Sequence, residues 1–114
     1  METKWIDKLL DVDFKGRDIL ARQIIESVVT YRKEHAFISL KFEEIYCTEK
    51  YPYQIRVPVE MRAYQDKGAP VLFLLHIIDG LVNELEIVSA DLSEIVESTI
   101  SLENVKHEIN SEVL

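Results

Sequence analysis

The chain has 114 residues, of which 47% are apolar and 30% are charged. This length predicts one domain over residues 1–114, and the composition excludes a disordered or collagen-like chain. No apolar run approaches the roughly 18 residues that cross a bilayer, so no membrane partner is expected. The single cysteine, Cys47, excludes an internal disulfide and favours a reducing compartment, so we expect a cytoplasmic protein.

The formal net charge of −8 is unevenly placed along the chain. Residues 1–67 hold 12 acidic and 12 basic residues, whereas residues 68–114 hold nine acidic residues and one basic residue, Lys106. Phosphate binding needs a basic surface, so direct binding of nucleic acid is not expected. A basic partner is the physical complement of this charge, and a solvated face that keeps the protein soluble explains it equally well.

Two helices are predicted near the beginning of the chain. The first, Trp5–Leu10, is short and has its apolar residues on one side. The second, Asp18–Tyr31, repeats apolar residues at close to the helical period of 3.6, although Val28–Tyr31 also suits the beginning of a strand. The polar residues of this helix, Arg22, Gln23 and Glu26, fall opposite the apolar stripe, which we expect to pack on a sheet or on other helices.

Alternation of apolar and polar residues predicts strands in the middle and at the end of the chain. Phe37–Phe42 and Gln54–Tyr64 both alternate. Pro58 has no N–H to donate, so the second run suits an edge position or a bulge. The stretch between them, residues 43–52, is turn-like. Val105–Ile109 suits a last short strand, and the five residues that follow it look frayed.

The clearest element is a β-hairpin in which Val71–Ile78 and Leu81–Ser89 flank Asp79-Gly80. An Asp-Gly pair between two apolar runs is typical of a type I′ turn, because both central residues need a positive φ. The elements together predict an α+β fold, with an N-terminal helix or helices packed on a mainly antiparallel sheet of four to six strands.

A regular two-residue turn also predicts the register of the hairpin. His76 then faces Asn83, and Leu74 faces Leu85 on the same side of the ladder. Glu84 and Glu86 lie on the other side, about 6.5–7 Å apart by strand rise. Three readings of this acidic pair stay open: a glycosidase-like acid and base, a site for a basic side chain of a partner, or internal pairing with Arg56 or Arg62.

His76 also has two readings. It is a general base or ligand, or it is a core-edge histidine hydrogen-bonded to Asn83, and the second is favoured because no other histidine or cysteine is spaced to join it. No H-x-x-x-H, C-x-x-C or calcium-loop pattern occurs, so neither a metal nor a cofactor is expected. Cys47 has no surrounding sequence that would activate a thiol as a nucleophile.

Two stretches of the hairpin region carry a resemblance, Val71–Gly80 with the pattern LHIIDG and Asn83–Ile95 with NELEI and AD-x-SEI. They resemble a family of small bacterial domains without assigned enzymatic activity, whose members often end in this hairpin. Leu92 departs from the pattern, since a glycine after Ala-Asp is more usual. Small acidic proteins with one cysteine also look like immunity proteins of contact-dependent inhibition and related polymorphic toxin systems.

The resemblance implies that the chain is an inhibitor and not an enzyme, and that it binds and masks the active site of a basic toxin, with a nuclease as the expected kind. The candidate contact residues are acids of the second half: Asp79, Glu84, Glu86, Asp91 and Glu94, with Glu97 and Glu103 as further candidates. The alternative is a small ligand-binding or hydrolytic domain that uses His76 with neighbouring carboxylates. A third hypothesis is a homodimer, instead of a monomer, in which an exposed hairpin strand pairs with its symmetry mate.

Overall fold

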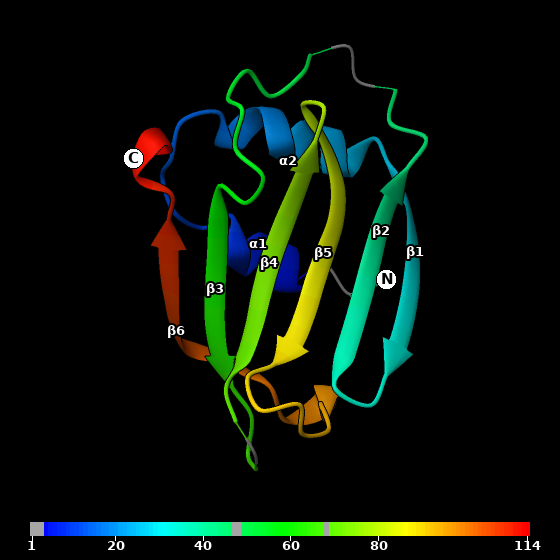
Figure 1. Cartoon of the computed structure of the whole chain (residues 1–114), viewed down its shortest axis with the longest axis vertical. Coiled ribbons are helices and arrows are strands. Elements are labelled where there is room, and N and C mark those ends of the chain that lie inside the picture. The colour runs from blue at the N-terminus through cyan, green and yellow to red at the C-terminus, as the bar shows by residue number, and fades with distance from the viewer. Residues whose placement is uncertain (1–3, 47–48, 68) are drawn as a thin grey trace.

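The computed structural model describes residues 4–46, 49–67 and 69–114. Two short helices, α1 (Lys4–Leu9) and α2 (Arg17–Ile25), precede the strands (Figure 1). The strands are β1 (Val28–Glu34), β2 (Phe37–Glu43), β3 (Val59–Tyr64), β4 (Val71–Ile78), β5 (Leu81–Ser89) and β6 (Ser101–Ile109). The 3-10 turns η1 (Glu97–Thr99) and η2 (Ser111–Val113) lie on either side of β6.

The six strands form one antiparallel sheet in the order β1-β2-β5-β4-β3-β6. This confirms the predicted α+β fold with an antiparallel sheet of four to six strands. The β4–β5 hairpin occupies the centre of the sheet, and β1 and β6 are its edges. Both hairpin strands already have a neighbour on each side, so neither is the exposed strand that the homodimer hypothesis pairs with a second copy.

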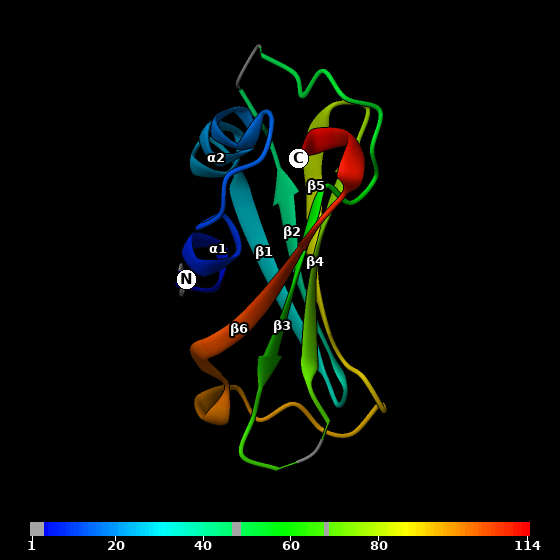
Figure 2. The same ribbon diagram turned by 90° about the vertical axis from the view of Figure 1, so that its left-hand side faces the viewer.

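Both α-helices lie on one side of the sheet, which we call the covered face (Figure 2). Alternate strand residues, such as Met61, Phe73 and Leu85, are buried there against the helices. Trp5 of α1 meets Phe73 edge to face, with ring centroids 5.9 Å apart. The other side of the sheet, which we call the open face, carries the intervening residues, and His76 is among them.

The second helix is shorter than predicted. It ends at Ile25, and Val28 already begins β1, so the strand reading of Val28–Tyr31 is confirmed and the helical one is wrong. The Ser27 hydroxyl donates to the carbonyl oxygen of Ile24 at 2.7 Å and closes the last turn. The β-branched residues that follow favour an extended chain.

Gln23 of α2 is completely buried, although the helical pattern predicts it on the polar side. Its amide nitrogen donates to the carbonyl oxygens of Gly80, at 2.9 Å, and Glu49, at 3.1 Å. Its amide oxygen accepts from the Val82 N–H at 2.8 Å. One side chain thus joins the helix, the hairpin and the segment before β3, and its hydrogen bonds offset the cost of burying it.

The hairpin has the predicted turn but a different register. Asp79 and Gly80 have φ of 53° and 77°, as a type I′ turn requires. Ile78 faces Leu81 as expected, but Asn83 is an extra residue in β5, so that His76 faces Glu84 instead of Asn83. This is a β-bulge, which a count from a regular two-residue turn cannot anticipate.

The bulge changes which residues share a face. Beyond Asn83 every pair is displaced by one residue, so Leu85 faces Leu75 instead of Leu74, and both are buried in the core. Glu84 and Glu86 consequently face His76 and Leu74 on the open face, and not Leu75 and Phe73 as predicted. A one-residue displacement exchanges the two faces of a strand, and here it brings a histidine and two carboxylates together.

Two further expectations along the chain need correction. The predicted strand Gln54–Tyr64 is regular only from Val59, since Pro58 precedes the ladder. The last residues are not frayed, because the Val113 side chain is fully buried and its carbonyl oxygen accepts from the Lys15 N–H at 2.8 Å. The last strand begins at Ser101 and is longer than predicted.

Candidate functional site

The five candidate acids lie in three places. Asp79 is at the tip of the β4–β5 hairpin, and Glu84 and Glu86 point from β5 onto the open face. Asp91 and Glu94 follow β5, in the loop at the opposite end of the sheet (Figure 1). The fold therefore distributes these acids along the whole length of the hairpin and does not gather them into one cluster.

A hydrogen-bonded chain crosses the open face at His76. The Arg56 Nε donates to His76 Nδ1 at 3.1 Å, and His76 Nε2 lies 2.8 Å from a carboxylate oxygen of Glu86. Of the three readings of the acidic pair, direct pairing with Arg56 or Arg62 is not among the described contacts, because Glu86 bonds His76, which in turn bonds Arg56. The backbone holds the same contact, since the Ile77 N–H donates to the Arg56 carbonyl oxygen at 2.7 Å.

The two contacts determine where the His76 ring carries its proton. An arginine Nε–H can only donate, so Nδ1 accepts and the neutral ring carries its hydrogen on Nε2, which donates to Glu86. Both ring nitrogens are therefore occupied, and the histidine side chain is only 16% exposed. A general base needs a nitrogen that a substrate proton can reach. This arrangement supports a role for His76 in holding the sheet face together.

Glu84 is also held from within the protein. Its carboxylate accepts a hydrogen bond from the hydroxyl of Ser39, a residue of β2 that is 2% exposed. In the ladder Glu84 lies between Lys41 and His76. The pair Glu84 and Glu86 thus has a polar neighbour on each adjacent strand, which fixes both carboxylates and leaves part of each open to solvent.

At the far end of the sheet, a hydrogen bond within the loop after β5 also holds the Asp91 carboxylate in place. The Ser93 N–H donates to the Asp91 carboxylate at 2.9 Å, and hydrogen bonds from Ser93 lower the pKa of Asp91. Leu92 between them has a φ of 65°, in the left-handed region that favours glycine. Leu92 therefore stands in place of the expected glycine at a position where the backbone does adopt a positive φ.

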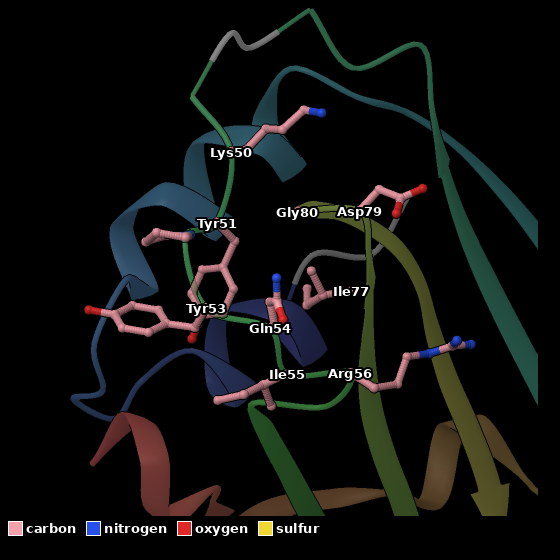
Figure 3. Close-up of a pocket in the computed structure, with 10 residues that line it drawn as sticks. Lys50, Tyr51, Tyr53, Gln54, Ile55, Arg56, Ile77, Asp79 and Gly80 are labelled. Atoms are coloured by element: carbon pink, nitrogen blue, oxygen red, sulfur yellow. The ribbon is translucent and has the colours of Figure 1, made fainter.

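A pocket of about 450 Å³ lies beside the hairpin tip (Figure 3). Residues 50–56 form one wall, and Ile77, Asp79 and Gly80 form the other. Figure 3 shows the Asp79 carboxylate directed away from Lys50. Neither His76 nor Asn83 lines this pocket, so it does not join the histidine to the partners that a hydrolytic site would need.

A second hollow, of about 250 Å³, lies on the other side of the hairpin tip. We call it the hairpin groove: residues 42–45 at the end of β2 form one wall, and residues 78, 79 and 81–83 form the other. It brings Asp79 together with Glu43 and Glu44, two exposed acids that the sequence places only in a turn. The signal for them is two successive acids directly after an alternating strand.

Cys47 lies outside the residues that the structure describes. Within residues 4–46, 49–67 and 69–114, no group of three or more histidine, cysteine, aspartate or glutamate side chains could hold a metal ion. In the same ranges, no helix has the length and apolar character that a membrane span needs.

Comparisons of the chain with family models, with curated proteins and with solved structures found no match.

Proposed function

We propose that this chain is an immunity protein, which binds a basic bacterial toxin and masks its active site. A nuclease is the expected kind of toxin, since nuclease surfaces are basic where they hold phosphate. The chain then acts by binding and not by catalysis, and its working place is the cytoplasm of the cell that it protects. This proposal extends the resemblance of the hairpin sequence with an observation on charge.

The observation that carries the proposal is that, among the described residues, the acids of the second half make no described ion pair with a lysine or an arginine. Three of the four described ion pairs join residues of the first half, such as Arg17 with Asp18 and Arg22 with Glu49. The fourth joins Glu86, one of the nine acids in residues 68–114, to His76, which is a cation only when its ring is protonated. Lys41 faces Glu84 across the ladder without a described ion pair. The negative charge therefore remains for an external partner.

The position of these acids also suits binding. Three of them, Asp79, Glu84 and Glu86, lie on the central hairpin of a six-stranded sheet, where the backbone is held by neighbours on both sides. Rigid charges lose little freedom when a partner docks, and a negative surface accelerates the encounter with a positive one. Apolar contacts that exclude water then slow dissociation.

The proposal predicts that a basic toxin is encoded immediately upstream of this chain's own gene, and charge substitution tests it in the complex with that toxin. Glu94→Lys is expected to slow association about tenfold or more at low salt, and the effect should shrink in high salt. Asp11→Lys makes the same change of charge at an exposed position between the two helices and serves as the control. Equal effects of the two changes, or no binding by the unaltered chain, would argue against the proposal.

The alternative, a ligand-binding or hydrolytic domain that uses His76, rests on the contact between this histidine and Glu86. The occupied ring nitrogens give it less support. It predicts that His76→Ala abolishes an activity of the folded chain. The immunity proposal predicts that the same change lowers stability and leaves inhibition of the toxin intact once the protein is folded.

A further inference from the structure

The hairpin groove exists because two neighbouring strands separate before they end. Pairing between β2 and β5 stops at Lys41 and Glu84, although β2 continues to Glu43 and β5 begins at Leu81. The bulge at Asn83 increases the local twist and turns the hairpin tip away from β2. Figure 1 shows the two strands diverging towards this end of the sheet.

The walls of the groove are largely apolar. Phe42 and Val82 are buried at its base, and Ile45 and Leu81 are partly exposed along its sides. Ile78, the last residue of β4, also lines the groove and is 38% exposed. Such walls fit the methylene groups of a long side chain, because burying these groups removes apolar surface from water on both partners.

The rim of the groove is acidic. Glu43, Glu44 and Asp79 are exposed, and the described residues offer none of them a side-chain hydrogen bond or an ion pair. The nearby cations have other positions: Arg22 pairs with Glu49, and the Asp79 carboxylate points away from Lys50 (Figure 3). An apolar hollow with an uncompensated negative rim complements a long cationic side chain.

We propose that the hairpin groove receives an arginine or lysine side chain of a basic protein partner. The aliphatic part of that side chain lies against Ile78 and Leu81, and its charged end meets the three rim carboxylates. This inference rests on the proposed function, because it names the part of the surface that anchors the toxin. It assigns the anchor to Asp79 with two acids of the first half, and not to Glu84, Glu86, Asp91 or Glu94.

The groove variant that tests this assignment replaces each rim acid by its amide: Glu43→Gln, Glu44→Gln and Asp79→Asn. Asparagine keeps the type I′ turn, because Asn-Gly adopts it as readily as Asp-Gly. The control variant removes the same charge outside the groove and outside the candidate contact acids, by Asp11→Asn, Asp66→Asn and Glu112→Gln. All six positions are exposed, so both variants should fold.

The first measurement maps amide chemical shifts during titration with the peptide acetyl-Gly-Arg-Lys-Arg-Gly-amide at low salt. Shifts are expected at residues 42–45 and 78–83, in the unaltered chain and in the control variant, and they should be lost in the groove variant. Shifts centred on the far end of the sheet, shifts that persist in the groove variant, or no shifts at all would each overturn the groove as a cation site.

The second measurement compares the affinities of the two variants for the toxin encoded upstream. The groove variant is expected to bind about thirtyfold more weakly than the unaltered chain, and the control variant within about threefold. If both variants bind as tightly as the unaltered chain, the groove assignment fails and the immunity function stands. If the unaltered chain itself does not bind the toxin, the proposed function fails, whatever the peptide shows.

Discussion

At the scale of single residues, the fold depends on a few polar side chains that are placed where apolar ones are expected. Gln23 is the main example, since it is buried and makes three hydrogen bonds to three backbone segments. Its position in the helix predicts a solvent contact. The partners that make burial favourable come from residues 49, 80 and 82, which are distant in sequence.

Gln23→Ala is expected to lower the free energy of unfolding by about 2–4 kcal/mol, because it leaves the buried Val82 N–H without an acceptor and opens a cavity. The control is Arg22→Ala, which breaks an exposed ion pair with Glu49 and should cost less than about 1 kcal/mol. Urea denaturation measures both. Similar losses in the two variants would contradict the role given to Gln23.

Leu92→Gly is expected to stabilise the protein. Leu92 is 69% exposed and has a φ of 65°, so its side chain contributes little to the core while its backbone is strained. Relief of the strain, about 1–2 kcal/mol, is larger than the entropy cost of glycine, which is about 0.5–1 kcal/mol. Leu92→Ala keeps the Cβ atom and should bring no gain. Thermal unfolding measures the midpoint temperature of each variant. A higher midpoint for Leu92→Ala than for Leu92→Gly would refute the explanation.

Glu60 predicts a pH dependence of stability. It lies opposite Glu108 across β3 and β6, and burial, followed by the charge of Glu108, raises the pKa of Glu60 above its usual 4.5. The folded chain therefore holds a proton that the unfolded chain releases, and stability falls as the pH rises from 4.5 through the raised pKa. Below this range the carboxyl group is neutral in both states, and the penalty is absent.

At pH 7, the free energy of unfolding of Glu60→Gln should consequently be higher than that of the unaltered chain, by less than about 1 kcal/mol. The difference should vanish near a pH of about 3, where glutamate is protonated in both states. Glu103→Gln, an exposed change on β6, is the control and should show no such trend. A gain for Glu60→Gln that is the same at both pH values would contradict the account.

At the scale of elements, the hairpin shows how far local patterns reach. The Asp79-Gly80 signal correctly predicts the turn, because the backbone requirement for a positive φ is local. The extra residue Asn83 has no local signal, since the strands around it alternate without a break. Which residues share the open face with His76 therefore depended on packing in three dimensions. The ends of α2 and β3 do have local signals, in the β-branched residues that follow Ser27 and in Pro58.

The bulge predicts different costs for two deletions in β5. Removing Asn83 brings the pairs Ile77–Val82 and His76–Glu84 together without changing faces, so the loss should be about 1 kcal/mol. Removing Glu86 moves Ile87 from the core to the open face and should cost more than about 3 kcal/mol or prevent folding. Equal stabilities of the two deletion variants in urea would contradict the observed register.

At the scale of the whole molecule, the charge asymmetry of the sequence becomes a spatial property. Described ion pairs with lysine or arginine join acids and bases of the first half, while the acids of the central hairpin and of the loop after it take part in no such described pair, although Lys41 faces Glu84 across the ladder. Sequence counts predict this excess and assign it to the second half. Only the fold adds Glu43 and Glu44 to the hairpin end, because β2 lies beside β5 in space.

Titration of the purified chain into an activity assay of the toxin encoded upstream is the most direct test of the central claim. Toxin activity is expected to fall in proportion to the added chain and to be abolished near one equivalent. Full toxin activity in the presence of excess folded chain would contradict it.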